Sequence, residues 1–500
     1  MCLVLVVIAE STRDDLIVTT ESGRFRGRRY YLPTLGKTVD AFLGIPFAKP
    51  PIGPLRFRHP QPYVHNNTIY NATRMPNSCY QVPDMMFGPD FHGTNMWNPT
   101  TKVSEDCLYL NIWIPKTKPR LRKSAVLVWI YGGGFYSGTA TLNLYDGRIL
   151  AAENNIIVVS VGYRIGAFGF LFLNSAGAPA NAGLFDQLMG LEWIQQHIRA
   201  FGGDPNNVTL FGESAGASSV SLHLLSPLSR SKFQRAIMQS GTANMPWVAV
   251  TMTEAIRRSM ELAVEILGCD PSEDRDMIAD CMRMKTSQTI VDNQYLSKGI
   301  LQFPFLPVID GAFLPESPDE LLSRRNFKKC PILLGSNLNE GSYFLFYELD
   351  KLLTLDTTTM SANDFQESLR YLFYYYPQFN QEISKAAMNA ILYQYTNWLD
   401  LDNAEANALA LDNAVGDSQF ICPLNSFANK YSSAGENVYM YFLTQRYSVN
   451  PWPAWTGVLH GDDVVYVFGE ALKQGLNFSE ADRELSRTMM MYWTNFAKTG

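Results

Sequence analysis

Short apolar runs alternate along this chain with longer segments that have the periodicity of amphipathic helices. The helical segments lie at 183–201, which ends at a Gly-Gly-Asp-Pro breaker, and at 215–225. Strands that alternate with helices predict an α/β fold with a mostly parallel sheet, whose site lies at the carboxyl ends of its strands. We therefore expect one large domain over residues 10–500. The apolar runs predict buried strands at 124–130, 155–161, 208–211, 235–238, 331–334 and 438–442.

The first nine residues form an apolar run that is too short to span a bilayer. With small residues at Val7 and Ala9, they fit the apolar part of a secretory signal peptide, although no Lys or Arg precedes them. A first β-strand is the alternative interpretation. Asn-x-Ser/Thr sequons, which accept glycans on exported proteins, support export. They occur at Asn66, Asn71, Asn207 and Asn477, of which Asn66 and Asn71 lie in a polar, loop-like stretch.

Composition narrows the class of protein. Hydrophobic residues make up 46% of the 500 residues and charged residues 18%, which excludes a disordered or fibrous chain. The net charge of −6 lacks the excess of basic residues that a nucleic-acid-binding protein needs. We expect neither a metal nor a cofactor. Aromatic residues reach 13%, enough to line a deep pocket as well as a core. Seven cysteines are too few for a disulfide scaffold, and the odd number leaves at least one without a partner in the chain.

The segment Gly212-Glu-Ser-Ala-Gly216 lies between a predicted strand and a predicted helix. It matches the G-x-S-x-G nucleophile elbow in the context that this motif requires. A sharp turn there exposes the hydroxyl of Ser214, and the helix that follows offers backbone N–H groups. Ser214 is therefore the predicted nucleophile.

A serine nucleophile needs donors for the oxyanion that forms during acyl transfer. The glycines 132–134 follow a predicted strand at the position and in the order that lipases and esterases use for this purpose. We expect the N–H groups of Gly133, Gly134 and Ala215 to be these donors. A phosphate-binding loop is the rival interpretation, and the absence of a Walker lysine counts against it.

The general base should be a histidine that follows Ser214 in the chain, with an acid between the two. Only His223 and His460 follow it, and His223 falls on the helix that leaves the elbow. His460, in a glycine-flanked loop, is the better base. Glu340, which follows the strand at 331–334, is the predicted acid. Asp310 is also allowed by chain order, but it precedes a glycine as turn residues do.

These motifs, in this order, resemble the cholinesterase/carboxylesterase branch of the α/β-hydrolases, from about residue 14 to the end of the chain. The segments 42–48, 104–112 and 201–205 carry the same resemblance. It implies an α/β-hydrolase fold: a large, mostly parallel sheet flanked by helices, with a deep aromatic gorge. It also implies ester hydrolysis through an acyl-enzyme, and a catalytic domain that continues beyond residue 500.

Within this family the chain looks like an invertebrate-type cholinesterase. The segment 96–99 resembles the one that carries the choline-binding tryptophan, so Trp97 would bind a quaternary ammonium by cation–π attraction. A core tryptophan is the alternative. The resemblance adds Glu213, Tyr145 and Tyr343 to the choline site, and it assigns to the gorge and its rim Asp84, Tyr136, Phe344, Tyr347 and Trp452.

The acyl pocket would be formed by Trp247, Leu301 and Phe303. Phe303 matches one of two bulky residues that restrict the acyl group in vertebrate enzymes, and Leu301 takes the place of the other. We therefore expect a roomier pocket that accepts propionyl and butyryl esters. At the rim, no tryptophan occurs between 280 and 300, and Val82 stands where an aromatic residue is usual, so a peripheral ligand site is in question.

The resemblance also assigns the cysteines. It implies disulfides Cys79–Cys107 and Cys269–Cys281, and a partner for Cys422 beyond the end of the chain. Cys330 would be a free buried thiol, and Cys2 would leave with the signal peptide. A missing C-terminal segment could support a homo-oligomer or a membrane or collagen-like anchor.

The implied activity is hydrolysis of acetylcholine and related choline esters, with sensitivity to organophosphates and carbamates. A broad-specificity carboxylesterase shares the serine, histidine and acid but does not need Trp97. A cholinesterase-like adhesion protein commonly lacks one of the three residues, all of which this chain retains. The expected location is secreted or at the extracellular cell surface, plausibly at a synapse.

Overall fold

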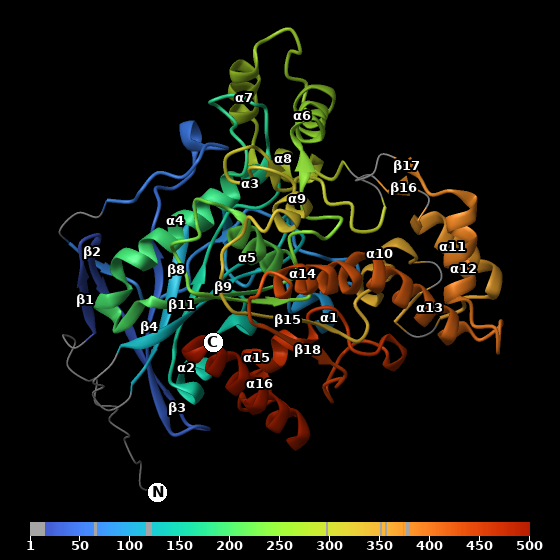
Figure 1. Cartoon of the computed structure of the whole chain (residues 1–500). Coiled ribbons are helices and arrows are strands. Elements are labelled where there is room, and N and C mark those ends of the chain that lie inside the picture. The colour runs from blue at the N-terminus through green and yellow to red at the C-terminus, as the bar shows by residue number, and fades with distance from the viewer. Residues whose placement is uncertain are drawn as a thin grey trace, which may run out of the picture.

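A nine-stranded sheet crosses the molecule in the order β18-β15-β12-β11-β9-β10-β8-β4-β3 (Figure 1). The five strand pairs from β18 to β10 are parallel, and the three pairs from β10 to β3 are antiparallel. The predicted mostly parallel α/β sheet is thereby confirmed. The strands are β3 Arg28–Leu32, β4 Lys37–Pro46, β8 Tyr109–Pro115, β9 Ser124–Ile130, β10 Ile157–Val161, β11 Gly203–Glu213, β12 Arg235–Gln239, β15 Ile332–Asn337 and β18 Val438–Leu443.

This computed structural model describes residues 16–64, 68–116, 123–296, 299–350, 353–355, 358–373, 375–376 and 381–500. The predicted signal peptide at residues 1–9 and the sequon residue Asn66 lie outside the described residues. Each apolar run that predicted a strand contributes to the central sheet. The strand predicted at 208–211 is longer than expected, because β11 starts at Gly203. Gly203 directly follows Gly202, which ends the preceding helical turn with a φ of 85°.

The central strands are apolar along their whole length because helices cover both faces of the sheet. All residues of β9 except Ser124 are buried, and all residues of β10 are buried. In Figure 1 helices α4 (Ala182–His197) and α5 (Ala215–Leu225) lie above the sheet, and α2 (Arg148–Asn154) and α16 (Glu480–Thr499) lie below it. Helix α5 has the predicted bounds, whereas the predicted helix 183–201 is α4 followed by a 3-10 turn.

The remaining elements surround this sheet. The small sheets comprise β1 Ile17–Thr20, β2 Gly23–Arg26 and β5 Ile69–Asn71; β6 Ser78–Cys79 and β7 Val103–Ser104; β13 Val250–Thr251 and β14 Val308–Ile309; and β16 Tyr375–Tyr376 and β17 Gln381–Glu382. The other helices are α1 His92–Asn95, α3 Gly166–Phe170, α6 Met252–Met260, α7 Arg275–Met284, α8 Ser287–Asn293, α9 Pro318–Ser323, α10 Ser342–Glu348, α11 Ala362–Phe373, α12 Lys385–Tyr395, α13 Ala404–Gly416, α14 Cys422–Ser432 and α15 Asp462–Val467.

Both expected disulfides, Cys79–Cys107 and Cys269–Cys281, are present. Among the described cysteines, Cys330 and Cys422 form no disulfide; Cys330 is buried and Cys422 is exposed. Within the described ranges, no helix combines the length and apolar composition that a membrane span requires.

Candidate active site

The turn from β11 to α5 presents Ser214 at the carboxyl edge of the sheet. Ser214 adopts φ 57° and ψ −127°, a strained conformation that its neighbours enforce. Its N–H donates to the carbonyl of Gln239, 2.8 Å away. A Cβ on Gly216 would lie 2.1 Å from the carbonyl oxygen of Ile130, so only glycine fits at that position. The sequence pattern of the elbow therefore follows from close backbone contact.

The triple glycine after β9 supplies backbone donors to the same cavity. Gly133 and Gly134 have positive φ angles of 107° and 58°. The carbonyl of Gly133 accepts hydrogen bonds from the N–H and the hydroxyl of Ser137, which orient this turn. Within the described residues, the N–H groups of Gly133 and Gly134 bond to no other protein group, and both residues line the cavity of Ser214. Free N–H groups in this position can bind a developing oxyanion.

His460 and Glu340 form a hydrogen-bonded pair across two loops. His460 Nδ1 lies 2.6 Å from Glu340 Oε2, and the side chain of Glu340 is fully buried. The other carboxylate oxygen, Oε1, accepts hydrogen bonds of 2.6 Å from the hydroxyl of Ser240 and from the N–H of Asn337. These contacts fix the orientation of the carboxylate, which in turn fixes the imidazole.

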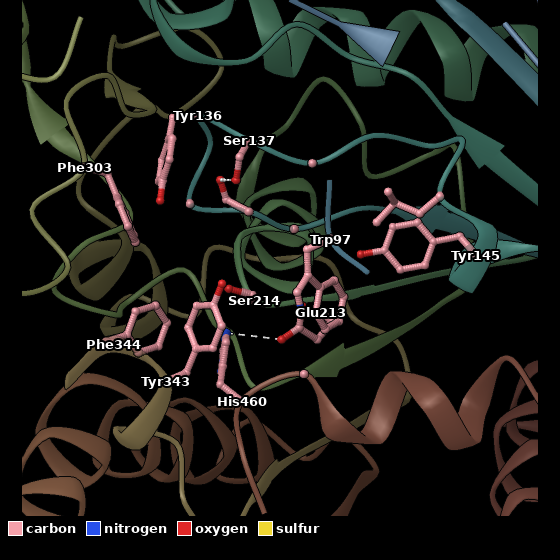
Figure 2. A pocket seen from close by; sticks show the side chains of 16 residues that line it. Trp97, Tyr136, Ser137, Tyr145, Glu213, Ser214, Phe303, Tyr343, Phe344 and His460 are labelled. Atoms are coloured by element: carbon pink, nitrogen blue, oxygen red, sulfur yellow. Dashed lines mark hydrogen bonds and ion pairs between the residues drawn. The ribbon is translucent and has the colours of Figure 1, made fainter. Parts of the chain in front are cut away.

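The second imidazole nitrogen faces the cavity. His460 Nε2 lies 3.2 Å from Glu213 Oε1, as the dashed line in Figure 2 marks. The two atoms are within ion-pair distance but not aligned as a hydrogen bond, and neither has a hydrogen-bond partner among the described residues. Ser214 lines the same cavity, although the described interactions include no hydrogen bond between it and His460. The imidazole therefore has a free nitrogen in the cavity that Ser214 also lines.

Burial and charge act in opposite directions on this pair. Burial lowers the pKa of His460, but the carboxylates of Glu213 and Glu340 outweigh it and raise the pKa above its ordinary value. Burial raises the pKa of Glu213, against the lowering effect of His460. The site thus stabilises a positive charge on the imidazole, which is the charge that a general base acquires when it accepts a proton.

Asp412 of α13 fixes the loop that carries Glu340. Its carboxylate accepts hydrogen bonds of 2.7 to 2.8 Å from the amide of Asn339 and from the N–H groups of Gly341 and Ser342. Burial raises the pKa of Asp412 to about 6. Sequence reasoning missed Asp412 because it lies some seventy residues from this loop, and it missed Ser240 and Asn337 because no motif marks them.

The alternative base and acid lie elsewhere. His223 is fully buried, its Nε2 lies 3.0 Å from the side-chain oxygen of Gln187, and burial lowers its pKa to about 3. The carboxylate of Asp310 accepts hydrogen bonds from the N–H groups of Ala312 and Leu314, as a turn residue does. Neither residue lines the cavity of Ser214.

The cavity in front of Ser214 encloses about 650 Å³ of space between its lining atoms, including the part that is open to solvent. Trp97 contributes an indole face, and Gly461 lets the His460 loop approach it, since a Cβ there would lie 3.0 Å from that ring. Sequence reasoning missed Ser137, Leu142 and Gly461 as lining residues. The predicted residues that line the cavity are Trp97, Gly133, Gly134, Tyr136, Tyr145, Glu213, Ser214, Phe303, Tyr343, Phe344 and His460 (Figure 2).

A chain of polar groups connects the cavity lining with the half-buried Asp84. The hydroxyl oxygens of Tyr343 and Tyr347 lie 3.0 Å apart, and the hydroxyl of Tyr347 donates to the carboxylate of Asp84. Trp452, like Asp84 and Tyr347, is expected in the gorge or at its rim and does not line the cavity of Ser214. Its ring packs behind Tyr343, with the centroids 5.7 Å apart.

Of the residues expected in the acyl pocket, only Phe303 lines the cavity. The ring of Trp247 packs behind it at a centroid distance of 5.6 Å, and the ring of Tyr136 lies 5.5 Å from it on another side. Leu301 instead lines two neighbouring cavities. Its φ of 56° is unusual for a residue other than glycine.

The described sequon asparagines differ in accessibility. Asn71 and Asn477 are exposed, whereas Asn207 is half-buried and its side-chain oxygen accepts a hydrogen bond of 2.6 Å from Arg235. In the part of the chain that the structure describes, no three His, Cys, Asp or Glu side chains gather as a metal site would require.

The comparisons with known proteins agree with this geometry. The acetylcholinesterase of Bungarus fasciatus is 47% identical over 99% of this chain and 80% of its own length. The acetylcholinesterase of Electrophorus electricus is 44% identical over 98% of this chain and 81% of its own length. The acetylcholinesterase of Danio rerio is 44% identical over 97% of this chain and 80% of its own length. The model of the carboxylesterase family matches residues 14–500. The chain therefore belongs to the carboxylesterase family, whose fold is that of the α/β-hydrolases, and it is a serine carboxylic ester hydrolase.

Proposed function

We propose that this chain hydrolyses choline esters, with acetylcholine as the main substrate, through an acyl-enzyme on Ser214. The observation that carries this proposal is that Ser214 and Trp97 line one cavity together with Glu213. A serine beside a histidine provides ester hydrolysis, and an indole beside a buried carboxylate provides a site for a quaternary ammonium. The names of the relatives support the same substrate class.

The proposed reaction starts when Ser214 Oγ attacks the ester carbonyl and passes its proton to His460 Nε2. The tetrahedral oxyanion accepts hydrogen bonds from the N–H groups of Gly133, Gly134 and Ala215. Nε2 then returns the proton to the leaving choline oxygen, and the C–O bond breaks. Glu340 stabilises the imidazolium throughout, because its carboxylate accepts a hydrogen bond from Nδ1.

Hydrolysis of the acyl-enzyme uses the same groups. His460 Nε2 takes a proton from water, whose oxygen attacks the acyl carbonyl, and the free N–H groups bind the second oxyanion. The proton returns to Ser214 Oγ as the bond to the acyl group breaks, which restores the enzyme and releases the acid. No external oxidant, metal or cofactor enters this balance.

The choline group would bind over Trp97, between the tyrosines Tyr145 and Tyr343. Cation–π attraction in a desolvated site is worth roughly 1–2 kcal/mol. The buried carboxylate of Glu213 adds Coulombic attraction, and Asp84, with Phe344 and Tyr347, would guide the cation through the mouth. Trp452 would act indirectly, by supporting Tyr343.

The acyl pocket is proposed to accept groups larger than acetyl. Phe303 is the bulky side chain facing the cavity, with Trp247 behind it. Leu301 lines the neighbouring cavities instead, so of the two positions that restrict the acyl group only Phe303 faces this cavity. We propose slower but measurable turnover of butyryl esters.

The chain is proposed to be one catalytic domain that functions outside the cell, at a synapse. Exposed Asn71 and Asn477 are the sequons best placed to carry glycans, and two disulfides fit an oxidising compartment.

Labelling by a radioactive organophosphate tests the serine chemistry. We expect stoichiometric labelling of the folded chain and none of the Ser214→Ala variant. A folded chain that is not labelled would favour an inactive adhesion protein. Comparing acetylthiocholine with naphthyl acetate then tests the substrate class. A preference for the naphthyl ester that Trp97→Ala leaves unchanged would favour a broad carboxylesterase.

A further inference from the structure

Residues 300–305, here called the acyl loop, form the wall of the cavity that carries Phe303. This loop has no strand or helix of its own and lies between α8 and β14. Its entry is a tight turn in which the N–H of Gln302 donates to the carbonyl of Gly299 over 3.1 Å. Leu301, with its φ of 56°, follows in the left-handed region. The acyl loop therefore has no strand pairing to fix its backbone, and other contacts must hold it.

The side chain of Arg258, on α6, holds the acyl loop from behind. Nη1 donates to the carbonyl oxygen of Phe303 over 2.7 Å and to that of Pro304 over 3.3 Å. Nε donates over 2.7 Å to Glu254, one helical turn earlier. The guanidinium is therefore anchored on its own helix and bridges directly to the backbone of the residue whose ring faces the substrate.

Arg258 and its neighbour Arg257 differ in burial. The side chain of Arg258 is 7% exposed, whereas that of Arg257 is 58% exposed, although both pair with Glu254. The described side-chain contacts of Arg257 are with Glu254, three residues before it, and with Glu261, four residues after it. None of them is with the acyl loop. One arginine thus reaches the site and the other does not.

Open space lies behind the acyl loop as well as in front of it. An open cavity with about 1390 Å³ of space, including the part that is open to solvent, is lined by Ile300, Leu301 and Gln302 together with Trp247 and Arg258. Packed side chains normally prevent displacement of a wall, because the interior is as dense as a crystal. Here the tether by Arg258 and the ring contacts of Phe303 resist displacement, since much of the rear of the loop faces empty volume.

We propose that Arg258 is a positioning residue that sets the acyl-chain selectivity of this esterase. It does so by holding the carbonyl of Phe303, and thus the ring, at a fixed distance from Ser214. The proposal rests on the proposed function, because it concerns the acyl group of that same reaction. An ordinary stabilising ion pair within α6 would give Arg257 and Arg258 equal roles, which their contacts contradict.

The experiment compares Arg258→Met with Arg257→Met, which removes the same charge from the same ion-pair cluster. For each variant, kcat/KM is measured with acetylthiocholine and butyrylthiocholine, and thermal unfolding is recorded. In Arg258→Met the acyl loop can move back into the cavity, so we expect the butyryl-to-acetyl ratio to rise roughly tenfold, the scale of pocket discrimination between acyl chain lengths. In Arg257→Met we expect the ratio to remain as in the parent chain.

Two further variants distinguish positioning from folding. Arg258→Lys retains a donor for the carbonyl of Phe303 and should restore much of the original ratio. Glu254→Gln weakens the anchor of Arg258 at a partly exposed position, and it should raise the ratio by less than Arg258→Met does. If Arg258→Met fails to fold, the ratios of Arg258→Lys and Glu254→Gln test the positioning role of Arg258.

An unchanged ratio in every folded variant, with both esters slowed equally, would overturn the proposal. A ratio that rises equally in Arg257→Met would also overturn it, because that arginine does not touch the loop. Absence of turnover with both thiocholine esters in the parent chain would instead count against the proposed function. The two failures are therefore distinguishable.

Discussion

Two loops near Ser214 are held in different ways. The Glu340 loop, residues 338–341, is fixed by hydrogen bonds to buried side chains, with Asp412 accepting from its backbone and Ser240 donating to Glu340. The acyl loop, residues 300–305, is tethered mainly by Arg258 and has a cavity behind it. The Glu340 loop is thus fixed by several buried hydrogen bonds, whereas the acyl loop depends mainly on one side chain.

The difference follows from what each loop must do. Proton transfer needs donor and acceptor within about 0.5 Å of their productive positions, so the acid and base require a fully bonded surrounding. An acyl pocket only has to discriminate between chain lengths, and a wall that yields changes selectivity before it changes chemistry. Changes in the Glu340 loop should therefore reduce kcat for all esters, and changes in the acyl loop should alter ratios between esters.

The largest effect is expected from Glu340→Gln. The amide keeps the shape but removes the charge that stabilises the imidazolium of His460, so kcat should fall by roughly 10³- to 10⁴-fold with every ester. Stopped-flow or steady-state assays with acetylthiocholine measure it. Asp310→Asn is the matched control and should retain full activity. A decrease in kcat of less than tenfold in Glu340→Gln would contradict the proposed role of Glu340 as the catalytic acid.

Asp412→Ala should have the next largest effect. It leaves the N–H groups of Gly341 and Ser342 and the amide of Asn339 without their acceptor, at a cost of about 1–3 kcal/mol for each group that stays unpaired. We expect a lower unfolding temperature and a kcat reduced by roughly 10- to 100-fold. Asp402→Ala, at an exposed position, serves as control. A loss of stability with unchanged kcat would show that the Glu340 loop does not need this support.

Glu213→Gln should change the pH dependence. The negative charge of Glu213 favours the protonated imidazole of His460, so its removal lowers the pKa of the base. The base is active when unprotonated, and therefore the acid limb of kcat/KM should move to lower pH. Naphthyl acetate is the appropriate substrate, because it has no charge of its own. Glu348→Gln, in the lining of a neighbouring cavity, should leave the limb in place. An upward movement in Glu213→Gln would contradict the account.

Phe303→Leu should have the smallest effect on the chemistry. The smaller side chain enlarges the acyl pocket, so the butyryl-to-acetyl ratio of kcat/KM should rise roughly tenfold while acetyl turnover changes by less than about threefold. The measurement uses both thiocholine esters under identical conditions. An equal loss with both esters would mean that the acyl loop is part of the rigid machinery after all.

Local sequence patterns predicted much of the framework. The continuous apolar runs of β9 and β10 reflect burial on both faces, and the glycines around Ser214 reflect backbone contacts that exclude a Cβ. Support by Asp412 and Arg258 was not predictable, because these side chains meet their partners only through tertiary packing. The contact of Trp452 with the ring of Tyr343 was not predictable either, because it too forms only through tertiary packing.

The most direct test of the choline-ester proposal compares acetylcholine with its uncharged carbon isostere, 3,3-dimethylbutyl acetate. The two esters share size and acyl group, so their ratio of kcat/KM isolates recognition of the positive charge. We expect the parent chain to prefer acetylcholine by roughly 5- to 30-fold, which corresponds to about 1–2 kcal/mol, and the preference to vanish largely in Trp97→Ala. Equal turnover of both esters by the parent chain would contradict the account.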